Sequence, residues 1–262
     1  MFGAELAGGI AAPGATAWGA VLASPFVGSF LGVLIRRLPE RRSVIWARSQ
    51  CEGCHAVLRP RDLVPLISWL AARGHCRFCR RPLGCFYPAI ELAAVAVAGV
   101  AVALDGGAAA WLDCLLGWWL LALAWIDVRH WLLPDALTLP LILVGLAAAI
   151  AFDPRALLDR ALGAVAGYLA LRGIAMLYRV VRGRDGLGEG DAKLLAAAGA
   201  WVGASGLPQV VLIAALAGLF AAACLRLAGL RLGLRSAVPF GPFLALATWL
   251  VWLGFAWMPP AL

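Results

Sequence analysis

The chain has 262 residues, of which 63% are hydrophobic and only 14% are charged. An ordinary soluble domain is about 45–50% apolar and about 25% charged, so this composition excludes a disordered chain and disfavours a soluble enzyme. The net charge of +8 does not indicate nucleic-acid binding, because the sequence has no nucleic-acid motif and no basic stretch interleaved with aromatic residues. A helix needs about 20 mostly apolar residues to cross a bilayer, so the number of membrane crossings is the useful quantity.

Eight apolar runs follow one another along the chain. In order they are Ala15–Ile35, Tyr87–Leu104, Ala108–Ile126, Leu133–Phe152, Ala156–Val180, Ala192–Gly203, Pro208–Leu227 and Val238–Trp257. The sixth run is the shortest, and the fifth carries Arg172 in its interior. The sequence therefore predicts an all-α, polytopic membrane protein with about eight transmembrane helices.

The basic residues fall almost entirely on one side of this map. Nearly all of the 22 lie in segments 36–81, 129, 179–193 and 226–235, whereas only Arg155 and Arg160 fall on the other side. Loops rich in lysine and arginine stay in the cytoplasm, so we expect these segments to be cytoplasmic and both termini to face outward. Arg172 is either a snorkelling side chain or the partner of a buried carboxylate.

The long polar segment between the first two runs, residues 36–86, contains two CxxC pairs made by Cys51, Cys54, Cys76 and Cys79. Two such pairs can enclose one tetrahedral ion, which suits a structural zinc site. A segment this short buries little core, so it needs a cross-link such as a metal ion to be stable. A disulfide is disfavoured because we expect the loop to lie in a reducing compartment. A neighbouring histidine, His55 or His75, could replace a thiolate, but four cysteines are the simpler ligand set. We therefore predict a small zinc-binding cytoplasmic domain.

Two aspartates, Asp127 and Asp191, lie at the ends of apolar runs and on the same predicted membrane face. Intramembrane carboxylates are costly and are candidates for function. Two close carboxylates share one proton, so one can take a proton from water while the other donates a hydrogen bond to a carbonyl, as metal-free peptide hydrolysis requires. The alternative is that both are interfacial charges and that Asp191 is a helix N-cap.

The residues around these aspartates have several open roles. Gly188 and Gly190 allow close approach of the backbone to the other aspartate or to an extended substrate. Asp135, which follows Pro134, is a candidate helix N-cap. Lys193 either shifts the ionisation of the nearby aspartate or binds a lipid phosphate.

Five motifs occur in a fixed order along nearly the whole chain. They are GSFLGVLIRRLP at 28–39, the CxxC pairs bracketing DLVPLISWL at 62–70, YPAIEL at 87–92, an IDxxxxxLPD pattern containing Asp127, and a GxGDxK pattern containing Asp191. Together they resemble the motifs of the type IV prepilin peptidases, also called leader peptidase/N-methyltransferases.

The resemblance implies that Asp127 and Asp191 are the catalytic pair of a GxGD-type intramembrane aspartyl protease. Its substrates would be type IV prepilins and type II secretion pseudopilins, whose basic leader is cut at the cytoplasmic face of the bacterial inner membrane. The family then methylates the new amino terminus with S-adenosylmethionine. The chain would consist of a first transmembrane helix at 1–35, the zinc domain at 36–86 and a seven-helix peptidase domain at 87–262.

Departures from the family pattern fall mainly in the part associated with methylation. Gly32 replaces the usual Asn, His75 replaces a basic residue, and Ser49 with Gln50 replaces an acidic residue before the first CxxC pair. A peptidase without methyltransferase activity is therefore one alternative. A proton-coupled transporter is another, but it would favour carboxylates near the bilayer midplane. A zinc-stabilised membrane scaffold is the third, and it gives no reason for two aspartates to share a face. The sequence predicts no oligomeric state.

Overall fold

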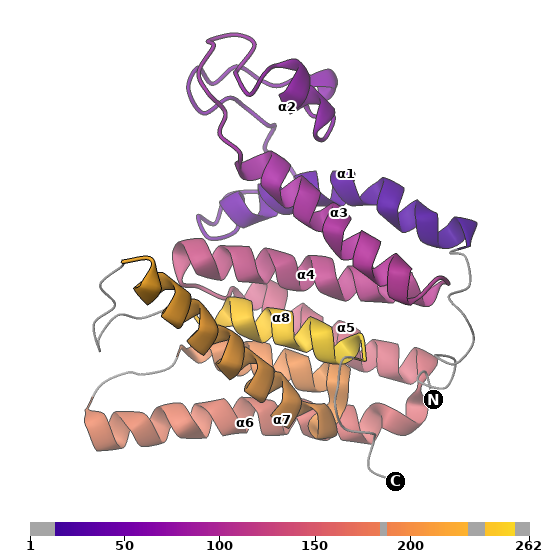
Figure 1. Cartoon of the computed structure of the whole chain (residues 1–262), viewed down its shortest axis with the longest axis vertical. Coiled ribbons are helices and arrows are strands. Elements are labelled where there is room, and N and C mark those ends of the chain that lie inside the picture. Colours follow the sequence, from indigo (N-terminus) through magenta and orange to yellow (C-terminus); the bar gives the residue numbers. More distant parts are fainter. Residues whose placement is uncertain (1–13, 184–187, 230–238, 255–262) are drawn as a thin grey trace. The chain divides into compact units, whose positions relative to one another are not determined.

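A computed structural model describes residues 14–183, 188–229 and 239–254. Within these ranges the chain is helical and forms no β-strand, only two isolated β-bridges. The α-helices are α1 (Ala15–Arg37), α2 (Ile67–Ala71), α3 (Phe86–Leu104), α4 (Ala109–His130), α5 (Asp135–Phe152), α6 (Leu157–Arg182), α7 (Glu189–Leu227) and α8 (Gly241–Trp252) (Figure 1). The predicted all-α fold is confirmed.

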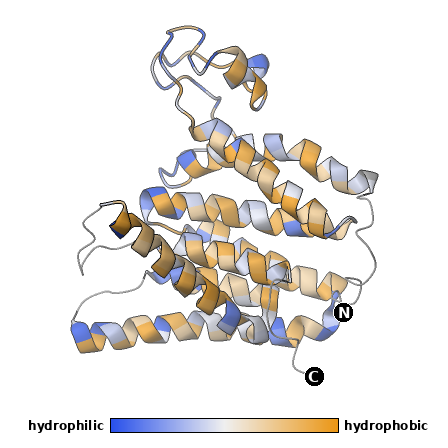
Figure 2. Ribbon diagram, viewed as in Figure 1, coloured by the Kyte–Doolittle hydropathy of each residue, from blue (hydrophilic) through white to orange (hydrophobic). Residues whose placement is uncertain are grey.

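Six of the described helices are long and apolar enough to cross a membrane, namely α1, α3, α4, α5, α6 and α7. Apolar residues run along these helices, whereas hydrophilic residues gather in the segment around α2 and at helix ends (Figure 2). The protein is therefore a multi-pass membrane protein.

The long helix α7 contains two of the predicted apolar runs. Its backbone leaves the helical conformation at Gly203, where φ is 79° and ψ is 173°, a region that favours glycine. This break separates the sixth run from the seventh, so the expected count of about eight transmembrane helices is roughly consistent with the structure. Helix α8 covers part of the last run, whose ends at Val238 and at Trp257 lie outside the described residues.

The chain divides into two compact units, the first ending at Ala122 and the second beginning at Leu123. In the first unit α1 packs closely against α3. A Cβ atom on Gly28 would lie 2.6 Å from the Glu91 Cα, and one on Gly32 would lie 2.7 Å from the Tyr87 ring. The glycines of the 28–39 motif are therefore required by the 87–92 motif, since the two motifs form one helix interface.

In the second unit the first part of α7 runs antiparallel to α6, and the two backbones are so close that glycines occupy their contact points. Gly199 lies against Gly163, and a Cβ atom on Gly167 would lie 2.5 Å from the Leu195 carbonyl oxygen. Small residues allow two membrane helices to approach this closely. From α5, the Leu141 carbonyl accepts a hydrogen bond of 3.0 Å from the Trp201 indole. The tight packing fixes the first turn of α7, which carries Asp191.

Arg172 of α6 lies beside this first turn, where it forms an ion pair of 3.8 Å with Glu189. Both side chains are exposed. The predicted alternative of a buried carboxylate partner is therefore wrong: the partner of Arg172 is a carboxylate, but an exposed one at a helix end.

Candidate active site and metal centre

Asp127 is buried in the last turn of α4, with 7% of its surface exposed. Its Oδ2 atom accepts a hydrogen bond of 3.1 Å from the backbone N–H of Gly241, the first residue of α8. A carboxylate at a helix N-terminus satisfies a free amide and is favoured by the helix dipole. The sequence reasoning missed Gly241, and the only signal available was the Gly241–Pro242 pair at the start of an apolar run.

Asp191 is the third residue of α7 and is half-buried. Its carboxylate accepts a hydrogen bond from the backbone of Gly188, which occupies the N-cap position. The alternative that Asp191 is itself the N-cap is therefore wrong. Asp191 lies close enough to Asp127 for the two carboxylates to interact electrostatically. The structure therefore brings the two aspartates within electrostatic range of each other, as the predicted topology permits.

Two contacts fasten the first turn of α7 to the segment that follows α4. A Cβ atom on Gly190 would lie 2.8 Å from the Leu133 Cβ, so this glycine is required by close packing. Lys193 Nζ lies 2.6 Å from Asp135 Oδ1. Asp135 does not cap α5, because Pro134 holds the N-cap position and no side chain caps this helix.

Paired carboxylates of this kind have a defined chemical capacity. Two interacting carboxyl groups cannot both ionise easily, so they hold one proton between them. One member can then accept a proton from water while the other donates one to a carbonyl oxygen or a leaving amine. The arrangement needs no metal ion and no nucleophilic side chain.

The predicted metal site lies in the first unit. The Sγ atoms of Cys51, Cys54, Cys76 and Cys79 all lie within 4.8 Å of one another. Cys85, His55 and His75 lie outside this group. The His75 ring instead contacts the Arg73 carbonyl oxygen at 2.7 Å. Among the described residues, the four-cysteine group is the one that could hold a metal ion.

Each cysteine pair lies in a turn of the same construction. In the first turn the N–H of Cys51 donates to the Ala56 carbonyl and the N–H of Leu58 donates to the Ser49 carbonyl. The same two bonds recur 25 residues later, from Cys76 to Arg81 and from Leu83 to Gly74. The positive φ angles of His55 and Arg80 occupy equivalent places. This structural repeat is hidden in the sequence, because backbone hydrogen bonds define it.

Backbone amides also prepare the first cysteine for metal binding. The N–H groups of Cys54 and Gly53 lower the pKa of the Cys51 thiol to about 6. This lowering favours the thiolate form of Cys51, which is the form that binds a metal ion.

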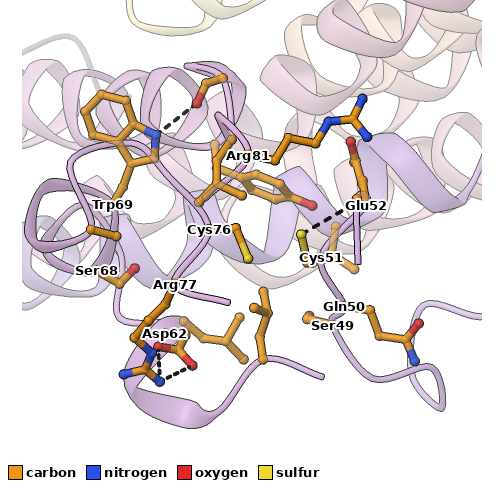
Figure 3. Close-up of a pocket in the computed structure, with 18 of the residues that line it drawn as sticks. Ser49, Gln50, Cys51, Glu52, Asp62, Ser68, Trp69, Cys76, Arg77 and Arg81 are labelled. Atoms are coloured by element: carbon orange, nitrogen blue, oxygen red, sulfur yellow. Dashed lines mark hydrogen bonds and ion pairs between the residues drawn. The ribbon is translucent and has the colours of Figure 1, made fainter. Parts of the chain in front are cut away.

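A cavity of about 550 Å³ lies between the cysteine turns and the helices α1, α2 and α3 of the first unit (Figure 3). Its walls include the aromatic rings of Trp69, Phe78 and Tyr87. The Trp69 indole donates a hydrogen bond of 2.9 Å to the Gly84 carbonyl, which fixes the orientation of this ring. The cavity is of the size that proteins use for small organic ligands.

Glu91 lies at the edge of this cavity with only 4% of its surface exposed. Its Oε2 atom accepts a hydrogen bond of 2.8 Å from the N–H of Leu66, which is the N-cap residue of α2. The sequence leaves open whether Glu91 faces the interior or is solvated, as a single acidic residue near a membrane interface usually is, and the structure shows the buried position. Glu91 instead ties the cysteine domain to α3.

The helices and the electrostatically interacting carboxylates define a multi-pass helical membrane protein with two aspartates at helix ends. Two family models match the chain: the bacterial peptidase A24 N-terminal domain over residues 22–104, and the type IV leader peptidase family over residues 114–223. The chain belongs to the type IV leader peptidase family, and it is a membrane protease.

Relatives with the name prepilin leader peptidase/N-methyltransferase match most of the chain. The Burkholderia pseudomallei protein is 41% identical over 252 residues, which are 86% of this chain and 81% of the relative. The Aeromonas hydrophila protein is 39% identical, with 88% of each chain covered. The Pseudomonas aeruginosa protein is 39% identical over 89% of this chain and 88% of its own length. None of the solved structures matches this chain significantly.

Proposed function

We propose that this protein cleaves the basic leader from type IV prepilins and type II secretion pseudopilins at the cytoplasmic face of the bacterial inner membrane. The observation that carries the proposal is the interacting pair Asp127 and Asp191, each at a helix end and each holding a backbone hydrogen bond. The family membership favours this peptidase over the transporter and scaffold alternatives.

In the proposed reaction the ionised member of the pair takes a proton from a water molecule, and the water oxygen attacks the scissile carbonyl carbon. The protonated member donates a hydrogen bond to the carbonyl oxygen, which carries the developing negative charge. The tetrahedral intermediate then collapses, and the leaving amine takes a proton from the pair. Gly241 and Gly188 hold the two carboxylates in place throughout.

The orientation of the substrate follows from the charge distribution. The segments rich in lysine and arginine lie in the cytoplasm by the positive-inside rule, and Asp127 and Asp191 lie at the same face. A basic leader is attracted to this carboxylate pair, while the apolar helix of the substrate stays in the bilayer. Cleavage then takes place at the cytoplasmic edge of the membrane.

The four-cysteine group fits a structural zinc ion. In a tetrahedral site of four thiolates, each zinc–sulfur distance is about 2.3 Å. The four Sγ atoms here all lie within 4.8 Å of one another, close enough to surround one such ion. The Sγ atoms of Cys51 and Cys79 lie 3.8 Å apart, and those of Cys54 and Cys76 lie 4.0 Å apart. The ion would cross-link the two turns of the domain at residues 36–86.

We propose in addition that the cavity beside the cysteine turns takes S-adenosylmethionine. Its aromatic walls suit the adenine ring, and the buried carboxylate of Glu91 suits a cationic ligand. Ser49, Gln50 and His75, which depart from the family pattern, all line this cavity, and Gly32 lies against the ring of Tyr87 in its wall. When bound, the donor would supply an electrophilic methyl group to the amine that cleavage leaves.

The peptidase proposal is tested by incubating the purified protein with a prepilin in detergent and measuring the products by mass spectrometry. We expect leader removal by the wild-type protein and none by Asp127→Asn or Asp191→Asn, because an amide cannot share the proton. Normal membrane insertion and zinc content of both variants serve as the control. Cleavage by both variants would exclude the carboxylate mechanism.

The methyl step is tested on the same products and by direct binding. A mass increase of one CH₂ on the processed pilin, only when S-adenosylmethionine is added, supports methyl transfer. Calorimetry with S-adenosylhomocysteine should detect binding to the wild-type protein and weaker binding to Trp69→Ala. Binding that is equal in both proteins would place the donor elsewhere.

The zinc proposal is tested by metal analysis of Cys51→Ser with Cys85→Ser as the matched control. Cys85 lies in the same domain but outside the four-cysteine group. We expect Cys51→Ser to lose bound zinc and Cys85→Ser to keep it. Equal zinc content in the two variants would reject the site.

A further inference from the structure

An ion pair joins the two motifs that carry the proposed catalytic aspartates. Asp135 is the first residue of α5, and its Oδ1 atom lies 2.6 Å from Nζ of Lys193 in the first turns of α7. The Lys193 side chain is 24% exposed and that of Asp135 is 57% exposed, so the pair lies at the surface with the lysine partly covered. The pair therefore connects two helix starts that are 58 residues apart in the sequence.

The Lys193 side chain lies on a different side of α7 from Asp191. Residues two positions apart on a helix point to different sides, so Lys193 does not face the same way as Asp191. Its ammonium group instead reaches Asp135. The sequence left two roles open for Lys193, a shift of the ionisation of Asp191 or the binding of a lipid phosphate. Its contact in the structure is Asp135 instead.

The segment between Asp127 and Asp135 is short and tightly turned. The N–H of Trp131 donates to the Asp127 carbonyl at 2.9 Å, and Trp131 has a positive φ of 54°. Leu133, two residues further on, packs against Gly190. A displacement of Asp135 is therefore transmitted through a few residues to the end of α4 that holds Asp127.

We propose that Asp135 and Lys193 form a positioning pair that sets the separation of Asp127 and Asp191. The inference rests on the proposed peptidase function. Asp135 lies on the segment that follows Asp127, and Lys193 lies on the helix that carries Asp191. The ion pair therefore holds the two carboxylate-bearing segments together. Because they must share one proton, a small change in their separation reduces turnover, and a misplacement of 1 Å can cost about 100-fold.

The test is a double-mutant cycle measured as prepilin cleavage in detergent. We expect Asp135→Asn and Lys193→Gln each to lower kcat by about tenfold or more, with KM unchanged, because neither residue touches the substrate. The double variant should lose no more than either single variant, since both remove the same contact. Lys193→Arg keeps the charge and should keep most of the activity.

Arg172→Gln is the matched control, because it removes a different ion pair from the same first turn of α7. Arg172 belongs to α6 and has no short connection to Asp127, so its removal should leave kcat unchanged. Wild-type kcat in both single variants, or losses that multiply in the double variant, would overturn the proposal.

Two further measurements keep the outcome unambiguous. Thermal unfolding of each variant reports whether the membrane unit stays folded. If a single variant unfolds, the charge-exchanged pair Asp135→Lys with Lys193→Asp decides: recovered cleavage supports the positioning pair, and absent cleavage in a folded protein rejects it. An inactive wild-type protein, or an active Asp127→Asn variant, would instead reject the proposed peptidase function.

Discussion

Gly241 donates its backbone N–H to the Asp127 carboxylate at 3.1 Å, across 114 residues of sequence. A side chain at position 241 is excluded by the same contact, because a Cβ atom there would lie 2.6 Å from Asp127 Oδ2. The start of α8 therefore serves the carboxylate pair in two ways, as a hydrogen-bond donor and as a surface against which Asp127 rests. One short helix thus belongs to the proposed active site, although none of its side chains carries the chemistry.

Gly241→Ala should inactivate the enzyme without unfolding it. The added methyl group forces either Asp127 or α8 to move, and a displacement of about 1 Å at a catalytic group can cost about 100-fold in kcat. The measurement is the rate of prepilin cleavage at saturating substrate. Gly218→Ala is the matched control, because a Cβ atom at this α7 position would make an ordinary contact of 3.5 Å with Phe243 of α8. Equal activity of the two variants would remove Gly241 from the site.

The sequence predicted those parts of the site that depend on side-chain chemistry. The distribution of basic residues predicts one membrane face for Asp127 and Asp191, and the structure brings the two within electrostatic range. The CxxC spacing identified the cysteine group. Gly241 could not be found in this way, because a backbone N–H group leaves no trace in the residue type. The contact of Lys193 with Asp135 was likewise hidden, since the sequence suggested a separate role for each residue, a helix N-cap for Asp135 and an aspartate or phosphate neighbour for Lys193.

The helices were predictable because their apolar runs are long, and their packing was less so. The break at Gly203 was visible only as the gap between two runs. Arg172 lies inside an apolar run, yet its side chain is exposed and reaches Glu189 at the start of α7. Hydropathy measures the composition of a segment, and therefore cannot show which part of a long helix has a neighbour.

The glycine contacts between α6 and α7 predict opposite effects for the same substitution in one helix. Gly167→Ala places a methyl group 2.5 Å from the Leu195 carbonyl oxygen, so we expect a loss of about 1–3 kcal/mol from overpacking. Gly173→Ala meets no atom within 4 Å, so the higher helix propensity of alanine should stabilise the protein by about 0.5–1 kcal/mol. The measurement is the thermal unfolding midpoint in detergent. Shifts of the same sign would contradict this description of the α6 and α7 interface.

Glu91 should control the attachment of the cysteine domain to α3. Its buried carboxylate accepts the N–H of Leu66, and removing a buried acceptor leaves that donor unsatisfied at a cost of about 1–3 kcal/mol. In Glu91→Ala we therefore expect faster hydrogen exchange in residues 64–72, measured by mass spectrometry, while Glu91→Gln keeps an acceptor oxygen and should show a smaller increase. Glu40→Ala is the control, because Glu40 is exposed and pairs with Arg42 on the surface. Unchanged exchange in Glu91→Ala would mean that α2 is held by its other contacts, and that the Leu66 bond adds nothing to the position of the domain.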